Sequence, residues 1–447
     1  MGKYFGTDGF RGEAGVTLTA DHAYRIGRFL GWYYAGEGGA RAVIGRDTRR
    51  SCDMLEAALV AGLTASGADA HLLGVITTPG VSFVTASEGF DCGVMLSASH
   101  NPYGDNGIKL VGKRGEKIDD ATVAAVERYL DEGAAELPFA VGERIGRVID
   151  HTAGQERYAK RLIALSPCGF GGLRIGLDCA NGCACEIAPA VFGALGAQVL
   201  AIHKSPNGVN INRNCGSLHT EALVELVRRE GLDMGFAFDG DADRCIAVDE
   251  RGEVVDGDRI LYVLAQYLRR QGALTADTVV TTVMSNLGLG RALARAGLRA
   301  VQTAVGDRFV YEEMRKNGYS LGGEQSGHVI LSRYAATGDG ILTAVTVTAA
   351  VLAEGRPLSA LAGAVQSFPQ ITESLRVADK HAAVTDAGVQ AAVAAARERL
   401  GTEGRVLVRE SGTEPVVRVM VEAVEEGICE AFAEEMVAVI QGEGLMV

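Results

Sequence analysis

The chain has 447 residues, of which 47% are apolar and 22% charged, a balance typical of a globular protein of roughly three domains. Its formal net charge of −13 argues against nucleic acid as a partner, because affinity for nucleic acid comes from Lys and Arg on phosphates. Its apolar stretches are too short to span a bilayer, and nine cysteines without a secretory signal suggest reduced thiols; we therefore expect a cytoplasmic protein with no membrane partner.

Strand, helix and strand follow one another three times along the chain. Apolar strands are predicted at residues 42–44, 173–177 and 279–284. Each is followed by a helix that ends at a glycine, which readily adopts the left-handed conformation that closes a helix, and then by a second strand. These glycines are Gly67, Gly196 and Gly297. The pattern is typical of parallel α/β sheets.

The fold expected from this pattern is three similar mixed α/β domains plus a smaller C-terminal α+β domain. The last domain is predicted from strands near 373–377, 406–408 and 416–421 and helices at 387–400 and 428–440. The expected domains are residues 1–150, 151–250, 251–367 and 368–447.

The first domain holds the most informative motif, Ser97-Ala98-Ser99-His100-Asn101-Pro102. Residues 92–96 before it are apolar and predict a buried strand, and Pro102 and Gly104 predict a turn. Open α/β sheets place their chemistry at the carboxyl ends of strands, where Ser99 lies. Earlier in the chain, residues 5–12 predict a glycine-spaced loop that could bring Arg11 close to a ligand; an ordinary turn is the alternative.

The second domain contains alternate carboxylates at Asp239, Asp241 and Asp243, between two apolar strands. Such oxygen ligands suit Mg²⁺ if the loop curls. An EF-hand is excluded because its sixth position is Arg244, not glycine, and the flanks are not helices; a solvated acidic turn is the remaining alternative. The closely spaced thiols at 179, 183 and 185 lack a second ligand pair, so we expect no metal there.

A phosphoryl group on Ser99 beside three carboxylates would leave the site negative even with Mg²⁺ bound. The chemistry therefore needs cations, for which Arg244, Lys109 and Arg11 are the candidates.

The third domain contributes Gly322-Gly323-Glu324-Gln325-Ser326-Gly327-His328. We expect Glu324, Ser326 and His328 to be exposed together at a strand end, where they could bind sugar hydroxyls and His328 could move a proton. A packed or solvated histidine is the alternative.

The fourth domain contributes Arg409-Glu410-Ser411-Gly412-Thr413-Glu414-Pro415, with Arg418 beyond. Two arginines, two hydroxyls and a glycine could form a phosphate clamp, since the planar guanidinium binds phosphate oxygens in pairs. A hairpin turn with incidental charge is the alternative.

These four loops together resemble the α-D-phosphohexomutase family over nearly the whole chain. The resemblance implies that the four domains are arranged around a central cleft. Within the family, Gln325 and the segments 3–12 and 206–212 resemble the branch that acts on glucosamine phosphates. The resemblance implies Ser99 as the phosphorylated residue and Mg²⁺ held by the three aspartates and a phosphoserine oxygen. It implies further catalytic residues at His100, Lys109, Arg11, His328 and Arg244. Substrate binding is implied for Glu324, Ser326, Arg409, Ser411, Gly412, Thr413 and Arg418. Relatives often have Pro where this chain has Glu410, whose carboxylate should weaken phosphate binding unless it points away.

The implied reaction converts glucosamine 6-phosphate reversibly to glucosamine 1-phosphate, which supplies UDP-N-acetylglucosamine for cell-wall synthesis. It proceeds through phosphoserine and glucosamine 1,6-bisphosphate, with that compound or glucose 1,6-bisphosphate as activator. The expected partner is a phosphorylated amino sugar, and the expected assembly a monomer or a homodimer. Two alternatives stay open: a phosphomannomutase or phosphoglucomutase with the same machinery, and a non-catalytic sugar-phosphate sensor.

Overall fold

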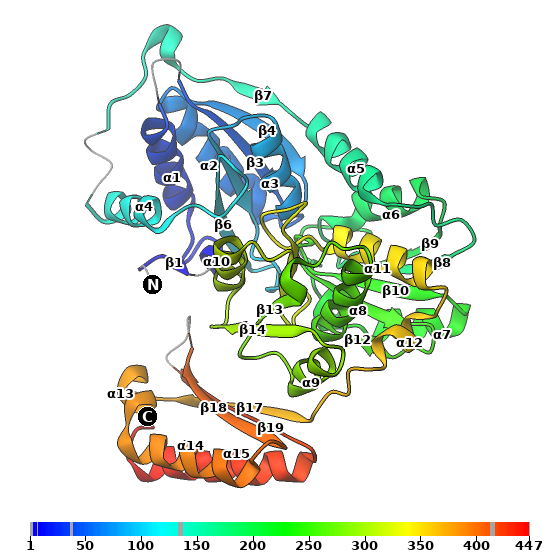
Figure 1. Cartoon of the computed structure of the whole chain (residues 1–447). Helices are drawn as coiled ribbons and strands as arrows, with labels where there is room; N and C mark the ends of the chain where they lie inside the picture. Colours follow the sequence, from blue (N-terminus) through cyan, green and yellow to red (C-terminus); the bar gives the residue numbers. More distant parts are fainter. Residues whose placement is uncertain (1–2, 7, 36–38, 133–136, 412–415, 447) are drawn as a thin grey trace. The chain divides into compact units, whose positions relative to one another are not determined.

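The computed structural model describes the chain except residues 1–2, 7, 36–38, 133–136, 412–415 and 447. Contacts along the chain divide it into two compact units, both drawn in Figure 1. The larger unit comprises Gly2–Met284 and Leu298–Ala364, and the smaller one consists mainly of Ser285–Gly297 and Val365–Val447.

The larger unit begins with a mixed sheet of seven strands. They are β1 (Phe5–Gly6), β2 (Gly9–Glu13), β3 (Arg41–Arg46), β4 (Asp69–Val75), β5 (Cys92–Leu96), β6 (Asp105–Gly112) and β7 (Val148–Asp150). Their order in the sheet is β1-β2-β6-β5-β3-β4-β7, with β3, β4, β5 and β7 parallel. The accompanying helices are α1 (Ala20–Tyr33), α2 (Ser51–Ala65), α3 (Thr78–Ser87) and α4 (Asp120–Glu132). Every residue of β5 is buried, as its unbroken apolar sequence requires.

A second sheet follows in the same unit. Its strands are β8 (Arg174–Asp178), β9 (Gln198–Ile202), β10 (Met234–Phe238), β11 (Cys245–Asp249) and β12 (Val254–Val255), in the order β12-β11-β10-β8-β9. Its helices are α5 (Ala153–Leu165), α6 (Ala184–Ala194) and α7 (Glu221–Glu230). Strands β8, β9 and β10 run parallel, so their carboxyl ends share one edge of the sheet.

The third sheet is the smallest in this unit. Its strands are β13 (Thr278–Thr282), β14 (Arg299–Thr303), β15 (Leu321–Gly323) and β16 (Val329–Leu331), in the order β14-β13-β15-β16. Its helices are α8 (Gly257–Arg270), α10 (Asp307–Asn317), α11 (Gly340–Glu354) and α12 (Leu358–Ala362).

The smaller unit is an antiparallel sheet with helices on one face. Its elements are α9 (Leu287–Arg295), β17 (Gln370–Arg376), α13 (Lys380–Thr385), α14 (Ala387–Leu400), β18 (Gly404–Glu410), β19 (Val416–Ala423) and α15 (Glu426–Gly442). The sheet order is β17-β19-β18, and Figure 1 shows α14 and α15 along the same face. Apolar residues at helical spacing on α15, among them Phe432, Met436 and Ile440, pack into its core.

The predicted fold class is confirmed: mixed α/β domains precede a smaller α+β unit. Gly67, Gly196 and Gly297 all have positive φ after α2, α6 and α9. The predicted loop at residues 5–12 is wrong in part, because β2 pairs with β6 and places Arg11 opposite Gly107 in a strand. The numerical domain boundaries stay predictions. In the part of the chain that the structure describes, no helix is both long and apolar enough to cross a bilayer.

Candidate active site

Three aspartates converge in the turn between β10 and β11. The two strands pair antiparallel up to Phe238 and Cys245, so residues 239–244 must reverse the chain in a tight turn. Ala242 takes a positive φ of 54° to do so. One carboxylate oxygen from each of Asp239, Asp241 and Asp243 lies within 4.8 Å of the other two, and all three residues are buried. The predicted convergence of these carboxylates is therefore present.

Ser99 meets this turn directly. Its hydroxyl donates to Oδ2 of Asp239, and the residue is only 1% exposed. The turn after β5 holds Ser99 at φ 51°, a conformation that costs a non-glycine residue energy and so needs support. Gly240 allows the two loops to touch, because a Cβ there would lie 2.6 Å from the backbone oxygen of Ser99.

That support comes from Arg49, which follows β3 at the same sheet edge. All five of its guanidinium N–H groups are used: Nε donates to Asp47 Oδ2 (2.8 Å), and the other four donate to backbone oxygens of residues 99, 101, 102 and 105. Asn212, from the second sheet's loops, donates to the oxygens of Ser99 (2.8 Å) and Asn101 (3.0 Å). Sequence reasoning gave neither residue a role, although Arg49 lies in the loop that follows the predicted strand at 42–44 and could have drawn attention there.

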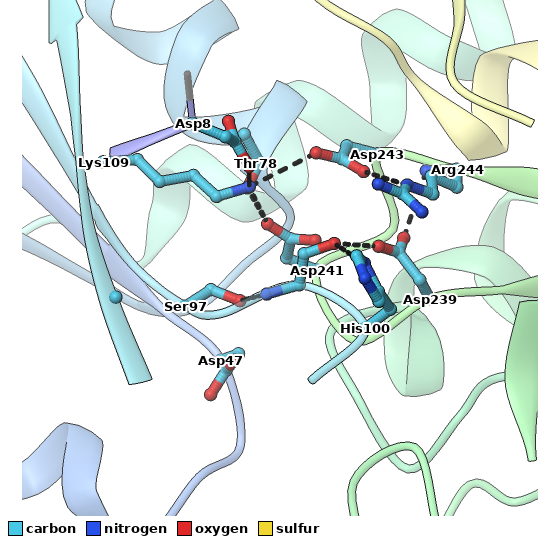
Figure 2. A network of polar contacts seen from close by, with 12 residues as sticks. Asp8, Asp47, Thr78, Ser97, His100, Lys109, Asp239, Asp241, Asp243 and Arg244 are labelled. Carbon is cyan, nitrogen blue, oxygen red and sulfur yellow. Dashed lines mark hydrogen bonds and ion pairs between the residues drawn. The ribbon is translucent and has the colours of Figure 1, made fainter. Parts of the chain in front are cut away.

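Two of the predicted cations, Lys109 and Arg244, lie beside the carboxylates (Figure 2). The Lys109 side chain reaches in from β6, and its Nζ contacts oxygens of Asp241 (2.7 Å), Asp243 (3.3 Å) and Asp8 (3.0 Å). Arg244 approaches from the opposite side, with its backbone N–H donating to Asp239 Oδ1 and its Nε 3.9 Å from Asp243 Oδ1. Arg11 pairs with Asp8 at 2.5 Å. Asp8 thus joins two of the predicted cations and was not singled out from the sequence.

The electrostatics of the turn favour an added cation. Burial and the neighbouring carboxylates raise the pKa of Asp239 well above its usual range. Oxygen Oδ2 of Asp241 already accepts from Thr78 and Lys109, whereas Oδ1 of Asp241 and Oδ1 of Asp243 are buried without a hydrogen-bond partner among the described residues. Buried carboxylate oxygens without donors fit the oxygen ligands of Mg²⁺, so the triad could hold this metal.

Two histidines border the site, and their surroundings shift their pKa values in opposite directions. His100 Nδ1 lies 3.3 Å from Ser99 Oγ, and burial together with Arg244 and Arg11 lowers the pKa of His100 to about 3. For His328, burial alone would lower the pKa, but Asp243 at 3.6 Å, Asp307 at 3.4 Å and Glu324 raise it to about 9. The N–H of Gly338 also points at Nε2 (3.0 Å), a contact that suits the neutral ring, but three carboxylates outweigh one amide.

The loop of Glu324, Ser326 and His328 was predicted to be exposed, and this is wrong. His328 is 3% exposed because β16 begins at the next residue and its ring is enclosed by carboxylates. Glu324 is half-buried, and burial raises the pKa of its carboxyl. The hydroxyl of Ser326 is buried without a hydrogen-bond partner in the described part of the chain. An unsatisfied hydroxyl and a partly desolvated carboxylate suit a polar ligand.

The predicted phosphate clamp lies in the smaller unit, on the hairpin of β18 and β19. Arg409 and Arg418 face each other across the two strands, and burial and the charge of Arg418 lower the pKa of Arg409. Ser411 is buried, and its backbone oxygen accepts from Lys380 Nζ (2.8 Å). Gly412 and Thr413 fall outside the described residues. The carboxylate of Glu410 pairs with His381 (3.2 Å) instead of an arginine.

Comparison with known proteins gives consistent matches along the whole chain. Profiles of the phosphoglucomutase/phosphomannomutase family match residues 2–136 (alpha/beta/alpha domain I), 156–252 (domain II), 256–368 (domain III) and 374–439 (C-terminal domain). A phosphoglucosamine mutase of Lachnospira eligens is 56% identical over 450 residues and covers 100% of both chains. One of Bacillus subtilis is 48% identical and covers 99% of both.

Solved structures share the fold. A phosphoglucomutase/phosphomannomutase family protein of Burkholderia thailandensis matches with a TM-score of 0.80 at 24% identity, covering 99% of this chain and 98% of its own. An N-acetylphosphoglucosamine mutase of Aspergillus fumigatus, in complex with GlcNAc-6P and magnesium, matches with a TM-score of 0.69 at 18% identity, covering 98% and 96%.

Proposed function

Because this chain belongs to the phosphoglucomutase/phosphomannomutase family, we propose that it interconverts glucosamine 6-phosphate and glucosamine 1-phosphate. It is an isomerase of the phosphohexomutase type, as are the phosphoglucosamine mutases that resemble it over their full length. The observation that carries the chemistry is the hydrogen bond from the Ser99 hydroxyl to Asp239. This aspartate belongs to a buried triad of carboxylates, and Lys109 donates to another member, Asp241.

The proposed reaction moves one phosphoryl group twice. In the first transfer the P–Oγ bond of phosphoserine 99 breaks and a P–O bond forms to O1 of glucosamine 6-phosphate; the proton of that hydroxyl is lost and the serine oxygen gains one. The 1,6-bisphosphate then presents O6, and the reverse transfer restores phosphoserine and releases glucosamine 1-phosphate. Such transfers need positioning and charge stabilisation more than covalent chemistry.

The chain's own residues supply most of that stabilisation. Lys109 and Arg244 bring fixed positive charge to within contact of the triad, Arg11 lies nearby on Asp8, and the imidazolium of His328 adds a fourth cation. Arg49 and Asn212 hold the serine loop by its carbonyl groups, so that Oγ keeps a fixed direction. Mg²⁺, for which Asp239, Asp241 and Asp243 are the proposed ligands, would neutralise charge on the transferring phosphoryl group.

Substrate binding is assigned to two loops. Glu324 and the unsatisfied hydroxyl of Ser326 are proposed to bind sugar hydroxyls. Arg409, Ser411, Gly412, Thr413 and Arg418 are proposed to bind the phosphate that does not react. The carboxylate of Glu410 contacts His381 and not an arginine of the proposed clamp.

Replacement of the nucleophile tests the phosphoryl-transfer chemistry. We expect S99A to carry no phosphate on the 97–102 peptide by mass spectrometry and to lose at least ~1,000-fold in kcat, since nucleophile removal abolishes the covalent route. Ser87 is exposed at the end of α3, so S87A is the matched control and keeps the parent's rate. Turnover by S99A at the parent's pace, with bisphosphate supplied, would refute the proposal; an unphosphorylated and inactive parent would favour the sensor.

Substrate comparison tests the sugar. We expect kcat/KM for glucosamine 6-phosphate to exceed that for glucose and mannose 6-phosphates with the same preparation. A preference for either neutral sugar would keep the phosphoryl-transfer chemistry and replace the specificity with that of a phosphoglucomutase or phosphomannomutase. The free thiols of all nine cysteines fit a reducing compartment, and we place the enzyme in the cytoplasm as a monomer or a homodimer.

A further inference from the structure

A second group of metal-ligating side chains lies at the carboxyl edge of the second sheet, outside the proposed active site. It consists of Asp178, the last residue of β8, His203, which follows β9, and Cys215. Asp178 pairs in register with Ile202, so the next residue, His203, leaves β9 beside the Asp178 carboxylate. The topology thus brings oxygen, nitrogen and sulfur donors together from three separate segments.

The three donor atoms are close and mostly buried. They lie within 4.8 Å of one another, with Asp178 Oδ2 at 2.9 Å from His203 Nδ1. Asp178 is fully buried and Cys215 is 1% exposed, whereas the side chain of His203 is 30% exposed. Within the described residues the only hydrogen bond to Cys215 Sγ comes from Asn181 Nδ2 at 3.9 Å, so the thiol proton has no acceptor.

We propose that Asp178, His203 and Cys215 bind Zn²⁺. A carboxylate, an imidazole and a thiolate are the three ligand types that zinc takes in proteins. Three protein ligands leave a fourth tetrahedral position for water, and His203, the most exposed of the three, lies on the side from which the ion can enter. Sulfur and nitrogen donors favour zinc over Mg²⁺, whereas the all-oxygen triad of the active site favours Mg²⁺, so the two sites select different ions.

Binding of the ion requires the thiol to ionise. Burial and the charge of Asp178 raise the pKa of Cys215 to about 12, so the metal-free protein holds the thiol. Coordination forms the Zn–S bond as the S–H bond of Cys215 breaks. The Zn–N bond replaces the hydrogen bond between His203 Nδ1 and Asp178 Oδ2, and the protons of the thiol and of that nitrogen leave to solvent.

The site has a structural consequence for Ser99. His203 and Cys215 bracket a loop that carries Asn212, the donor to the backbone oxygens of Ser99 and Asn101. Five non-glycine residues at positive φ lie in or beside this site, namely Ala180, Asn181, His203, Asn212 and Asn214. Such backbone is costly unless surrounding contacts fix it, and an ion that joins the two ends of the loop to β8 would fix it.

Cobalt substitution tests the site in the full-length protein without relying on activity. After chelator treatment, Co²⁺ is titrated into the parent, and the sulfur-to-cobalt charge-transfer band in the near ultraviolet reports thiolate ligation. We expect one equivalent to develop the band and Zn²⁺ to remove it by displacement. The oxygen-only triad cannot give this band, so D241N should retain it.

Single variants locate the ligand. C215S should abolish the band, and H203A should weaken Co²⁺ binding at least ~10-fold, since even outer-shell partners of a metal site are worth 10–100-fold. C168S removes the one exposed cysteine and should leave the band intact. Zn²⁺ should also raise the Tm of the parent and of C168S but not that of C215S.

X-ray absorption of the zinc-loaded parent gives a readout that needs no variant, and it should show one sulfur with nitrogen and oxygen neighbours. Absence of the charge-transfer band in the parent, or its survival in C215S, would overturn the proposal whatever the mutase assay shows. An X-ray absorption spectrum that shows no sulfur among the ligands of zinc would also overturn it.

Discussion

The most demanding consequence of the structure concerns Arg49, which touches neither the triad nor any proposed substrate group. Its fully buried guanidinium donates all five N–H groups, one to Asp47 and four to backbone oxygens of the serine loop. Lysine keeps the charge but has only three donors on one nitrogen, so R49K must leave at least two of these five acceptors without a partner.

The size of the effect follows from those lost bonds. Hydrogen bonds to charged groups contribute about 1.5–3 kcal/mol each, so two losses cost about 3–6 kcal/mol. Part of this falls on the free energy of unfolding. The remainder falls on the activation free energy of the transfer, because the loop no longer holds Ser99 at its positive φ. A rise of about 2.7 kcal/mol in that activation free energy lowers kcat about 100-fold.

Single-turnover transfer from phosphorylated enzyme to sugar phosphate, followed by rapid quench, measures that step directly. We expect R49K to lose about 100-fold in the transfer rate while KM changes little, and urea unfolding to show the loss of stability. Arg50 is exposed next to it, so R50K is the matched control and should stay within about twofold of the parent. A folded R49K that transfers phosphate at the parent's rate would show that the loop needs no such clamp.

Three further results are expected. N212G keeps a residue that tolerates positive φ but removes two donors to the serine loop, so its kcat should fall about tenfold, and an unchanged kcat would count against the clamp. D241N removes one carboxylate of the triad and should raise the Mg²⁺ concentration for half-maximal activity at least ~10-fold; an unshifted Mg²⁺ titration would place the metal elsewhere. Burial raises the pKa of Asp339 to about 6 in the folded protein, compared with about 4 in the unfolded chain. The free energy of unfolding therefore includes about 3 kcal/mol that is fully present below pH ~4 and is lost as the pH rises through ~6. D339N can still cap α11 and should flatten urea unfolding between these pH values; a slope equal to the parent's would assign the dependence to other groups.

The sequence predicted the parts of this fold that follow from local patterns. The glycines after α2, α6 and α9, the buried run of β5 and the turn between β10 and β11 are all set by neighbouring residues, and the structure confirms them. The three aspartates could be recognised as a set because a short turn between two paired strands leaves their carboxylates little room to diverge.

What the sequence could not predict depends on contacts between distant segments. Arg11 lies in a strand because β2 pairs with β6, which comes about a hundred residues later in the chain. His328 is buried because Asp243 and Asp307 come from other elements, so its local run of glycines gave the wrong exposure. The contacts of Arg49 and Asn212 with the serine loop, and of Asp8 with Lys109, join residues far apart in the chain, and an isolated polar residue has no signature of such a role.

The last consequence concerns competition between Lys109 and the metal for the same carboxylates. Nζ of Lys109 contacts Asp8, Asp241 and Asp243, so its three donors are satisfied by carboxylates, and these charges raise its pKa well above the usual range although burial alone would lower it. An entering dication must weaken those contacts, which frees the ammonium group for another anion such as a phosphoryl oxygen.

K109Q removes the competing charge, so Mg²⁺ should bind the unphosphorylated protein about tenfold more tightly by calorimetry, even though turnover falls. The matched control is K117Q, because the ion pairs of Lys117 join it to Asp8 and Asp307, and its Mg²⁺ affinity should stay near the parent's. If K109Q bound Mg²⁺ as weakly as the parent or more so, the lysine would be supporting the metal site, and the proposed exchange of one cation for another would be wrong.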